Sequence, residues 1–189
     1  MPSTFFPELK VKRLSPDVPM PAYAHRWDAG LDLCATEDVT LLPGESRKVG
    51  SGIMAAIPNG FAGLVLPRSG LGSKGLVIKT GVSLIDATYR GEIGLPLMNN
   101  NPTHIWQKTR NERLSEKFKR VIYNLLLRPC TNQGNVSAEG EIHVHKGDRV
   151  AQLVIIPVGI VRPVEVEDLD ETERADSGFG SSGVRYERP

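Results

Sequence analysis

An isolated carboxylate follows an apolar pair in the stretch SLIDATYRGEIG, which spans residues 83–94. Leu84 and Ile85 are typical of a strand, so we expect Asp86 at the strand end, with Tyr89 three residues later. A carboxylate at the mouth of a pocket can take a proton from water, and a neighbouring tyrosine offers a flat wall for a sugar. In the alternative interpretation, Asp86 supplies the geometry of a hairpin turn.

A second stretch, LPRSGLGSKG at residues 66–75, combines an arginine with closely spaced glycines. Small residues let backbone N–H groups point into one hollow that suits phosphate oxygens, and Arg68 would add a charge-assisted contact. The spacing of a Walker A loop is absent from this stretch. A plain turn before the next strand is the alternative to a phosphate site.

Two apolar stretches each contain one polar side chain that needs a partner. Asp32 lies in AGLDLCA, and Gln152 lies in GDRVAQLVI. An inward-facing aspartate pairs with an arginine, a turn N–H group or the water shell of a metal ion, and the sequence leaves these alternatives open. A buried glutamine amide must likewise find hydrogen-bond partners.

The stretch RADSGFGSSGV at residues 174–184 places Phe179 among glycines and serines, five residues after Arg174. Glycine disfavours a helix or a central strand here, so the stretch is either a frayed end or a mobile arm. As an arm, it would offer Arg174 to a phosphate and the ring of Phe179 to a planar base. Elsewhere, His143 and His145 would share one strand face; we favour solvent-facing histidines over a metal pair, because no third ligand lies nearby in the sequence.

The elements that must position these residues are predicted to be strands. Short apolar runs lie between turn residues, among them 19 glycines and 14 prolines, which indicates a sandwich or jelly roll in one domain of 189 residues. We expect an edge strand at residues 10–14 and a hairpin-type connection at PNG, residues 58–60. The formal net charge of +1 gives no sign of a nucleic-acid or membrane-surface binder.

Residues 101–140 depart from the strand pattern. The run NERLSEKFKRVIYNLLL has apolar residues at helical spacing, which predicts an amphipathic helix over about residues 112–127 within an inserted segment. Packing on the barrel is the first interpretation, and a partner-binding or nucleic-acid-binding insert is the second. The two cysteines, Cys34 and Cys130, lie far apart, and neither a signal peptide nor a membrane-spanning run is evident, so we expect a reduced, cytoplasmic protein.

Five stretches occur in a fixed order from residue 29 to residue 183: AGLDLCA, PRSGLGSKG, GVSLIDATYRGE, GDRVAQLVI and RADSGFGSSG. This arrangement resembles the trimeric dUTPase family. The resemblance implies one domain over residues 1–189, built as an all-β jelly-roll β-barrel subunit of a homotrimer. It also implies a C-terminal arm over residues 174–189 and active sites assembled from several chains. The implied reaction is hydrolysis of dUTP to dUMP and pyrophosphate with Mg²⁺.

The resemblance assigns roles residue by residue. Asp86 matches the family's catalytic aspartate, which activates the attacking water, and Asp32 matches the carboxylate that holds the metal through water. The implied substrate-binding residues are Arg68, Ser69, Gly70, Thr80, Gly81, Leu84, Ile85, Tyr89, Gly94, Gln152, Arg174, Phe179, Gly180, Ser181 and Ser182. No membrane or nucleic-acid partner is expected, and a protein partner at the 101–140 insert stays an open alternative.

Three positions depart from the family pattern. Ser177 stands where the arm usually has glycine, Thr88 where an acidic residue is frequent, and Thr80 where bacterial members often have asparagine near the uracil. The related dCTP deaminases need a glutamate as proton shuttle at the position of Pro96, which argues against deamination. A non-catalytic nucleotide sensor is a further alternative, and the complete set of motif residues argues against it.

Overall fold

The structure is a computed structural model that describes residues 7–102 and 140–172. The predicted helix at 112–127, most of the 101–140 insert and the arm from residue 174 lie outside the described residues. The described elements are β1 (Lys10–Arg13), β2 (Leu31–Cys34), β3 (Val39–Leu41), β4 (Ser46–Ala56), β5 (Phe61–Pro67), α1 (Ser69–Gly72), β6 (Leu76–Ile78), β7 (Ser83–Ile85), β8 (Glu92–Asn99), β9 (Ile142–Val144) and β10 (Arg149–Pro157).

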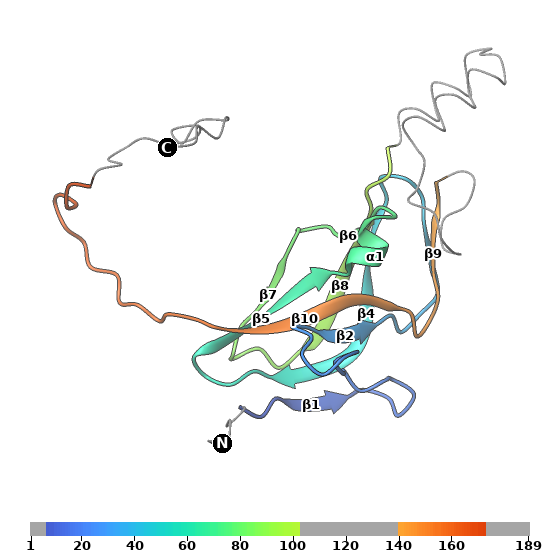
Figure 1. Ribbon diagram of the computed structural model, residues 1–189, viewed down its shortest axis with the longest axis horizontal. Helices are drawn as coiled ribbons and strands as arrows, with labels where there is room; N and C mark the ends of the chain where they lie inside the picture. Colours follow the sequence, from blue (N-terminus) through green and yellow to red (C-terminus); the bar gives the residue numbers. More distant parts are fainter. Residues whose placement is uncertain (1–6, 103–139, 173–189) are drawn as a thin grey trace, which may run out of the picture. The chain divides into compact units, whose positions relative to one another are not determined.

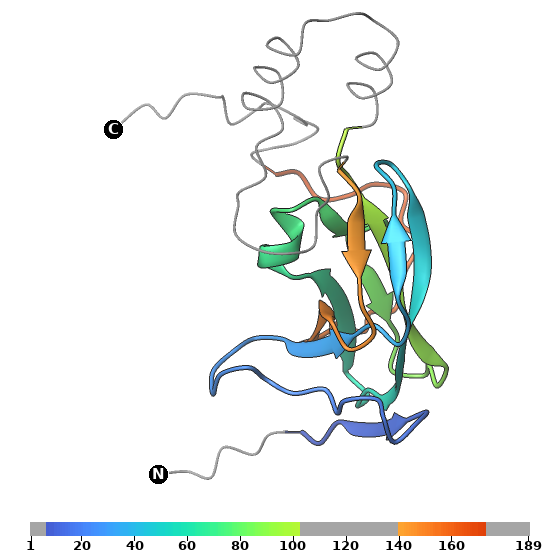
Figure 2. The ribbon, with the colours of Figure 1, turned by 90° about the vertical axis from the view of Figure 1, so that its right-hand side faces the viewer.

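These strands form two four-stranded sheets and a two-stranded ribbon (Figures 1 and 2). The first sheet has the order β1-β4-β8-β6, the second has the order β2-β10-β5-β7, and β3 pairs with β9. All strand pairs are antiparallel. Two packed antiparallel sheets of this kind make a jelly roll, so the predicted all-β class is confirmed.

The core lies between the sheets and follows from alternation along the strands. In β8 every second residue is buried, and Ile93, Leu95 and Leu97 are all 0% exposed. The residues between them, including Gly94 and Pro96, face away from the core. Burying each large aliphatic side chain contributes about 1.5–3 kcal/mol, so the inner face of β8 fixes which side chains its outer face presents.

The predicted hairpin at PNG is wrong. β4 and β5 flank this turn, but β4 pairs with β1 and β8, whereas β5 pairs with β10 and β7. The turn itself forms, with a hydrogen bond from Phe61 N to Pro58 O and a φ of 83° at Gly60. It carries the chain from one sheet to the other, because each flanking strand finds its hydrogen-bond partners far away in the sequence. The predicted edge strand is confirmed, since β1 lies at the end of its sheet.

A β-bulge interrupts β10 at Val150. Arg149 pairs with Cys34 and Ala151 with Leu33, so one extra residue is present in β10. Val150 and Ala151 are both buried, which departs from the alternation of a regular strand. The bulge places Arg149 and Gln152 on the same face of the sheet, although their spacing of three would put them on opposite faces of a regular strand.

A pair of asparagines ties Gly140 to the end of β8. Asn99 is 0% exposed, and its side-chain amide donates to Leu41 O at 2.8 Å and to Gly140 O at 2.9 Å. Asn101 N donates to Asn99 Oδ1 at 3.0 Å. The described residues on either side of 103–139 are therefore held close together by a buried, fully bonded amide.

The chain divides into two compact units, Met1–Gly159 and Ile160–Pro189. Of the second unit, residues 160–172 are described, and they contain no helix or strand. Their apolar side chains are exposed, at 84% for Ile160 and 85% for Leu169. No helix among the described residues is long and apolar enough to cross a membrane.

Candidate functional site

A pocket of about 230 Å³ opens where β7 and β8 meet their connecting turn. Its lining residues are Lys48, Ser83, Leu84, Ile85, Asp86, Tyr89, Glu92, Gly94 and Pro96. Five of these, all from the stretch at 83–94, are residues that the sequence assigned to catalysis or substrate binding. The structure therefore brings these five residues together around one cavity.

Asp86 lies directly after β7, whose last residue, Ile85, is 9% exposed and packs into the core. The buried isoleucine anchors the strand end and leaves the next side chain exposed. Within the described ranges, the carboxylate of Asp86 makes no hydrogen bond or ion pair. The turn is closed by its backbone, since Tyr89 N donates to Asp86 O at 3.1 Å. The carboxylate therefore does not supply the turn geometry and is available to a ligand.

Tyr89 forms a fixed wall of this pocket. Its hydroxyl donates to Glu92 O at 2.9 Å, which folds the ring back over the turn. A Cβ atom on Gly91 would clash with the tyrosine hydroxyl and ring, so glycine at this position permits the close approach. Tyr89 is 42% exposed, so its ring can contact a ligand on its free side.

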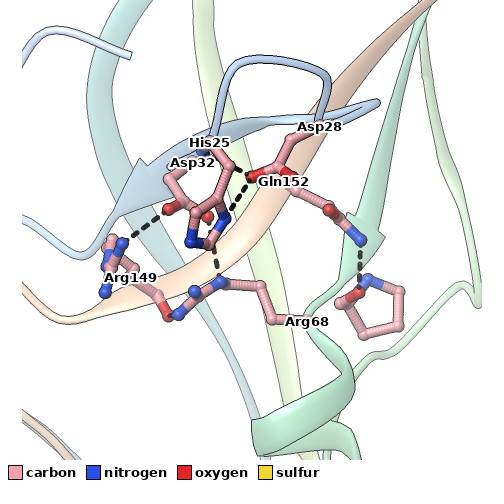
Figure 3. A network of polar contacts seen from close by, with 7 residues as sticks. His25, Asp28, Asp32, Arg68, Arg149 and Gln152 are labelled. Carbon is pink, nitrogen blue, oxygen red and sulfur yellow. Dashed lines mark hydrogen bonds and ion pairs between the residues drawn. The ribbon is translucent and has the colours of Figure 1, made fainter. Parts of the chain in front are cut away.

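A second group of predicted residues surrounds Asp32 (Figure 3). Arg68 Nε lies 2.9 Å from Asp32 Oδ1, and Arg149 Nη1 lies 3.0 Å from Asp32 Oδ2. The Asp32 side chain is 14% exposed, whereas those of Arg68 and Arg149 are 30% and 53% exposed. Of the alternatives that the sequence left open, the structure shows Asp32 paired with arginines. We call Asp32, Arg68, Arg149 and Gln152 the arginine cluster.

The register between β2 and β10 builds the arginine cluster. Gln152 lies directly opposite Asp32, and the bulge at Val150 turns Arg149 to the same face. Gln152 Nε2 donates to Pro67 O at 3.2 Å, which satisfies part of its amide. A Cβ atom on Gly30 would lie 2.8 Å from Gln152 Oε1, so glycine before β2 makes room for the glutamine.

Arg149 is a site residue that the sequence analysis missed. It contacts Asp32 through its side chain, and its backbone O accepts a hydrogen bond from Arg68 Nη1 at 3.0 Å. In a regular strand, residues 149 and 152 would face opposite sides of the sheet, so the sequence did not group Arg149 with Gln152. The bulge that brings them to the same face has no reliable signal in the local sequence. The two adjacent apolar residues Val150 and Ala151 are the feature that could have revealed it.

The glycine-spaced stretch after Arg68, for which the sequence left open a phosphate-binding hollow or a plain turn, forms a one-turn helix, α1. Gly72 N donates to Arg68 O at 2.8 Å, and Ser73 N donates to Ser69 O at 3.0 Å. The N–H groups of a helix's first turn have no partner within the helix, and no side chain caps α1. Ser69 and Gly70 are exposed, so the predicted phosphate-contact residues are accessible.

Thr80 and Gly81 do not line the pocket. They lie in the turn before β7, where the hydroxyls of Thr80 and Ser83 are 3.1 Å apart and Gly81 has a φ of 75°. The remaining predicted site residues, Arg174, Phe179, Gly180, Ser181 and Ser182, lie outside the described residues. The structure therefore places most of the described site residues in two groups, the pocket and the arginine cluster, with Ser69 and Gly70 on α1 and Thr80 and Gly81 in the turn before β7.

His143 and His145 contact residues that belong to neither group. His143 Nδ1 is 3.0 Å from Thr40 Oγ1, and His145 Nδ1 is 3.9 Å from Asp38 Oδ1. Over residues 7–102 and 140–172, no group of three or more histidine, cysteine or carboxylate side chains could hold a metal ion. Cys34, a half-buried free thiol beside the arginine cluster, has a pKa raised by burial and further by the Asp32 carboxylate, so it stays protonated near neutral pH.

Comparison with known proteins identifies the family. A model of the dUTPase family matches residues 16–114 and 134–183, and the unmatched stretch 115–133 falls inside the predicted insert. The chain is 40% identical over 176 residues to the deoxyuridine 5'-triphosphate nucleotidohydrolase of Nocardia farcinica, covering 93% of this chain and 85% of that protein. The enzyme of the same name from Corynebacterium glutamicum is also 40% identical, covering 93% and 94%.

Solved structures agree with this match. The dUTPase of Staphylococcus bacteriophage 80alpha with dUPNHPP superposes with a TM-score of 0.72 at 34% identity, covering 94% of this chain and 99% of that chain. A mutant dUTPase from phage phi11 of S. aureus, described with a structural Mg(II) ion, has a TM-score of 0.64 at 29% identity, covering 86% and 98%. The chain belongs to the dUTPase family.

Proposed function

We propose that this protein hydrolyses dUTP to dUMP and pyrophosphate. Membership of the dUTPase family supports the reaction, and one structural observation carries the mechanism. This is the free carboxylate of Asp86 in a pocket walled by Tyr89 and Gly94. Positioning and charge neutralisation, rather than a covalent intermediate, are what such a phosphoryl transfer requires.

Asp86 is the proposed general base. Its carboxylate accepts a proton from a water molecule, and the resulting nucleophile attacks the α-phosphorus in line with the departing pyrophosphate. The exposed position after β7 supports this role, because the carboxylate can reach a water molecule without leaving a protein partner. Gln152, on the arginine cluster, is proposed to lie near the same water and the α-phosphate.

The arginine cluster is the proposed triphosphate side of the site. Arg68 and Arg149 present cationic groups that form charge-assisted hydrogen bonds with phosphate oxygens, and Asp32 holds the two guanidinium groups in place. Ser69 and Gly70 would add hydroxyl and backbone contacts. Arg174 and Phe179 are proposed to clamp the terminal phosphate and to stack on uracil.

Mg²⁺ fits the arginine cluster through water rather than by direct coordination. Both carboxylate oxygens of Asp32 already accept from arginines, but each oxygen has a second lone-pair direction that can accept a metal-bound water. The nearby positive charge disfavours direct contact with a cation. Bound to substrate phosphates, Mg²⁺ would neutralise their charge, and Asp32 would hold its water shell.

The base pocket gives a physical basis for selectivity. The backbone on either side of the turn, from β7 to Gly94, is proposed to hydrogen-bond the uracil edge, and its close walls would exclude the methyl group of thymine. Tyr89, fixed by its bond to Glu92 O, would exclude a ribose 2′-hydroxyl. A site whose polar groups are left unpaired by the wrong base discriminates by about 10⁴ or more.

A homotrimer is part of the proposal. The pocket lining contains neither Asp32, Arg68 nor Gln152, and one substrate must touch both groups of residues. Sharing between subunits would bring a pocket of one chain to the arginine cluster of another. A protein partner at the 101–140 insert and a cytoplasmic location stay predictions. Deletion of residues 103–138 tests the first: unchanged kinetics with lost partner binding would support it.

The deciding experiment is a pyrophosphate-release assay on dUTP, dTTP, dCTP and UTP, each with and without Mg²⁺. We expect rapid release from dUTP, dependence on Mg²⁺, and little release from the other three. Equal rates on UTP or dTTP would contradict the proposed pocket. Deamination of dCTP is disfavoured because Pro96, which lines the pocket, carries no group that can move a proton.

A further inference from the structure

Lys48 is a pocket-lining residue that the motifs do not include. It comes from β4, which is the neighbour of β8 in the first sheet. Lys48 lies directly opposite Pro96 in the strand register, and Gly50 lies opposite Gly94, so the diagonal neighbour of Lys48 on the same face is Gly94. The lysine therefore reaches the pocket from a strand far in sequence from the stretch at 83–94.

The lysine side chain lies flat across Gly94. A Cβ atom built on Gly94 would clash with Lys48 Cε and would lie 3.3 Å from Nζ and 3.4 Å from Cδ. Glycine at position 94 is thus explained by the close approach of a side chain from the next strand. The same contact places the ammonium group directly over the backbone that we propose to meet the uracil edge.

The charge of Lys48 is not used within the described part of the protein. No hydrogen bond or ion pair joins its ammonium group to another described residue, and the side chain is exposed. Glu92, a carboxylate in the same pocket, is already engaged, because its Oε1 accepts from Gly52 N at 2.7 Å. The ammonium group of Lys48 is therefore a charged donor in the pocket that no described residue engages, in addition to the backbone groups proposed to meet the base.

The order of residues along the pocket shows which edge of the base Lys48 can meet. Tyr89, the proposed sugar wall, lies at the turn, and Gly94 and Pro96 follow along β8 at about 3.3 Å per residue. C4 lies opposite N1 in a pyrimidine ring, so a base that lies along β8 with its sugar at Tyr89 would direct C4 away from the turn, toward Gly94 and Pro96. The backbone of Lys48 is opposite Pro96, and its side chain leans back so that the ammonium group lies over Gly94.

We propose that Lys48 is a specificity-determining residue that donates a hydrogen bond to the 4-carbonyl oxygen of uracil. The proposal rests on the dUTP hydrolysis proposed above. An ammonium group only donates hydrogen bonds, so it pairs with a carbonyl oxygen and opposes the 4-amino group of cytosine. Uracil and cytosine differ at this atom, and one side chain from β4 would therefore distinguish dUTP from dCTP.

Two substitutions separate the charge from the packing. Lys48→Met keeps a long flexible stem over Gly94 but removes the donor, whereas Lys48→Arg keeps a cationic donor. Lys12→Met is the matched control, because Lys12 is an exposed strand lysine on β1 and does not line the pocket. All variants are compared as full-length chains by circular dichroism before assay.

The measurements are steady-state kinetics on dUTP and dCTP, and calorimetric binding of dUMP and dCMP. A hydrogen bond to a charged group is worth roughly 1.5–3 kcal/mol, so Lys48→Met should raise the KM for dUTP and the Kd for dUMP about 10-fold or more. The kcat for dUTP should change little, and dCMP binding should not weaken. Lys48→Arg should retain most of the preference for uracil, and Lys12→Met should match the unsubstituted protein.

The outcomes separate this inference from the proposed function. If the unsubstituted protein hydrolyses dUTP and Lys48→Met has the same KM and the same preference for uracil, the role of Lys48 is overturned alone. If Lys48→Met weakened the binding of dUMP and of dCMP equally, the proposal would also be overturned. That result would mean that Lys48 contributes packing to the pocket and not a hydrogen bond to uracil. A protein that neither binds dUMP nor hydrolyses dUTP would overturn both proposals.

Discussion

Asp32 and Asp86 are the same side chain in two contrasting surroundings. Asp32 is 14% exposed and contacts two arginines at 2.9 Å and 3.0 Å. Asp86 is exposed, and no described residue pairs with its carboxylate. A carboxylate already bonded to cations holds those cations in place, whereas an unbonded one can accept a proton from water. The comparison separates a residue that organises charge from one that performs chemistry.

The two regions are also positioned differently. The arginine cluster depends on the register between β2 and β10 and on a bulge, so residues more than a hundred positions apart in sequence meet there. The base pocket depends mainly on a single turn, closed by the backbone bond from Tyr89 N to Asp86 O. Long-range register fixes the charged groups, and local geometry fixes the base wall.

The largest expected effect is on kcat, when the carboxylate of Asp86 is replaced by an amide. Asp86→Asn keeps the size of the side chain but removes the proton acceptor, so kcat for dUTP should fall by about 10³-fold, within the 10²–10⁴ typical of a general base. Stopped-flow pyrophosphate release measures kcat, and dUMP binding should stay near that of the unsubstituted protein. Retention of most of the activity would remove Asp86 from the role of base.

A smaller effect is expected on the other side of the comparison. Arg68→Met removes a phosphate donor and leaves Asp32 with one arginine, so the KM for dUTP should rise about 10- to 100-fold. Arg47→Met is the control, because Arg47 forms an exposed ion pair with Glu37 at 3.2 Å that contacts neither region. A KM change shared by both variants would indicate a general charge effect instead.

The framework that carries both regions is tested at Asn99. Asn99→Ala removes, in a fully buried position, the hydrogen bonds to the carbonyls of Leu41 and Gly140 and the acceptor of Asn101 N. The free energy of unfolding should fall by about 2–3 kcal/mol, measured by urea denaturation. Without urea, where the variant is still folded, kcat and KM should be unchanged. A kinetic defect under those conditions would show that the framework and the site are not separable.

The smallest effect sharpens the description of the base wall. Tyr89→Phe keeps the ring and removes the hydroxyl that donates to Glu92 O. The ring should then be held less firmly, and kcat/KM for dUTP should fall about 5-fold, equivalent to roughly 1 kcal/mol for one hydrogen bond. The preference for dUTP over UTP should decrease in parallel, and an unchanged preference would contradict the role of the fixed ring.

The sequence predicted what local pattern and residue type can predict. Short apolar runs between turn residues predicted the strands, and the apolar pair before Asp86 located the pocket-lining turn. The PNG turn was recognised, but its strands were paired wrongly, because hydrogen-bond partners are chosen across the whole sheet. Arg149 and Lys48 were missed for the same reason: one depends on a bulge and the other on a neighbouring strand, and neither feature is visible in a local window.

The buried amide of Asn99 has a consequence for protein engineering. It binds Gly140 at 2.9 Å, so the chain leaves the barrel after β8 and re-enters it at nearly the same point. Closing a longer loop costs only about 0.6 kcal/mol for each doubling of its length. A fluorescent reporter or an affinity tag inserted between these two points should therefore leave strand pairing intact, which makes this position suitable for an internal fusion.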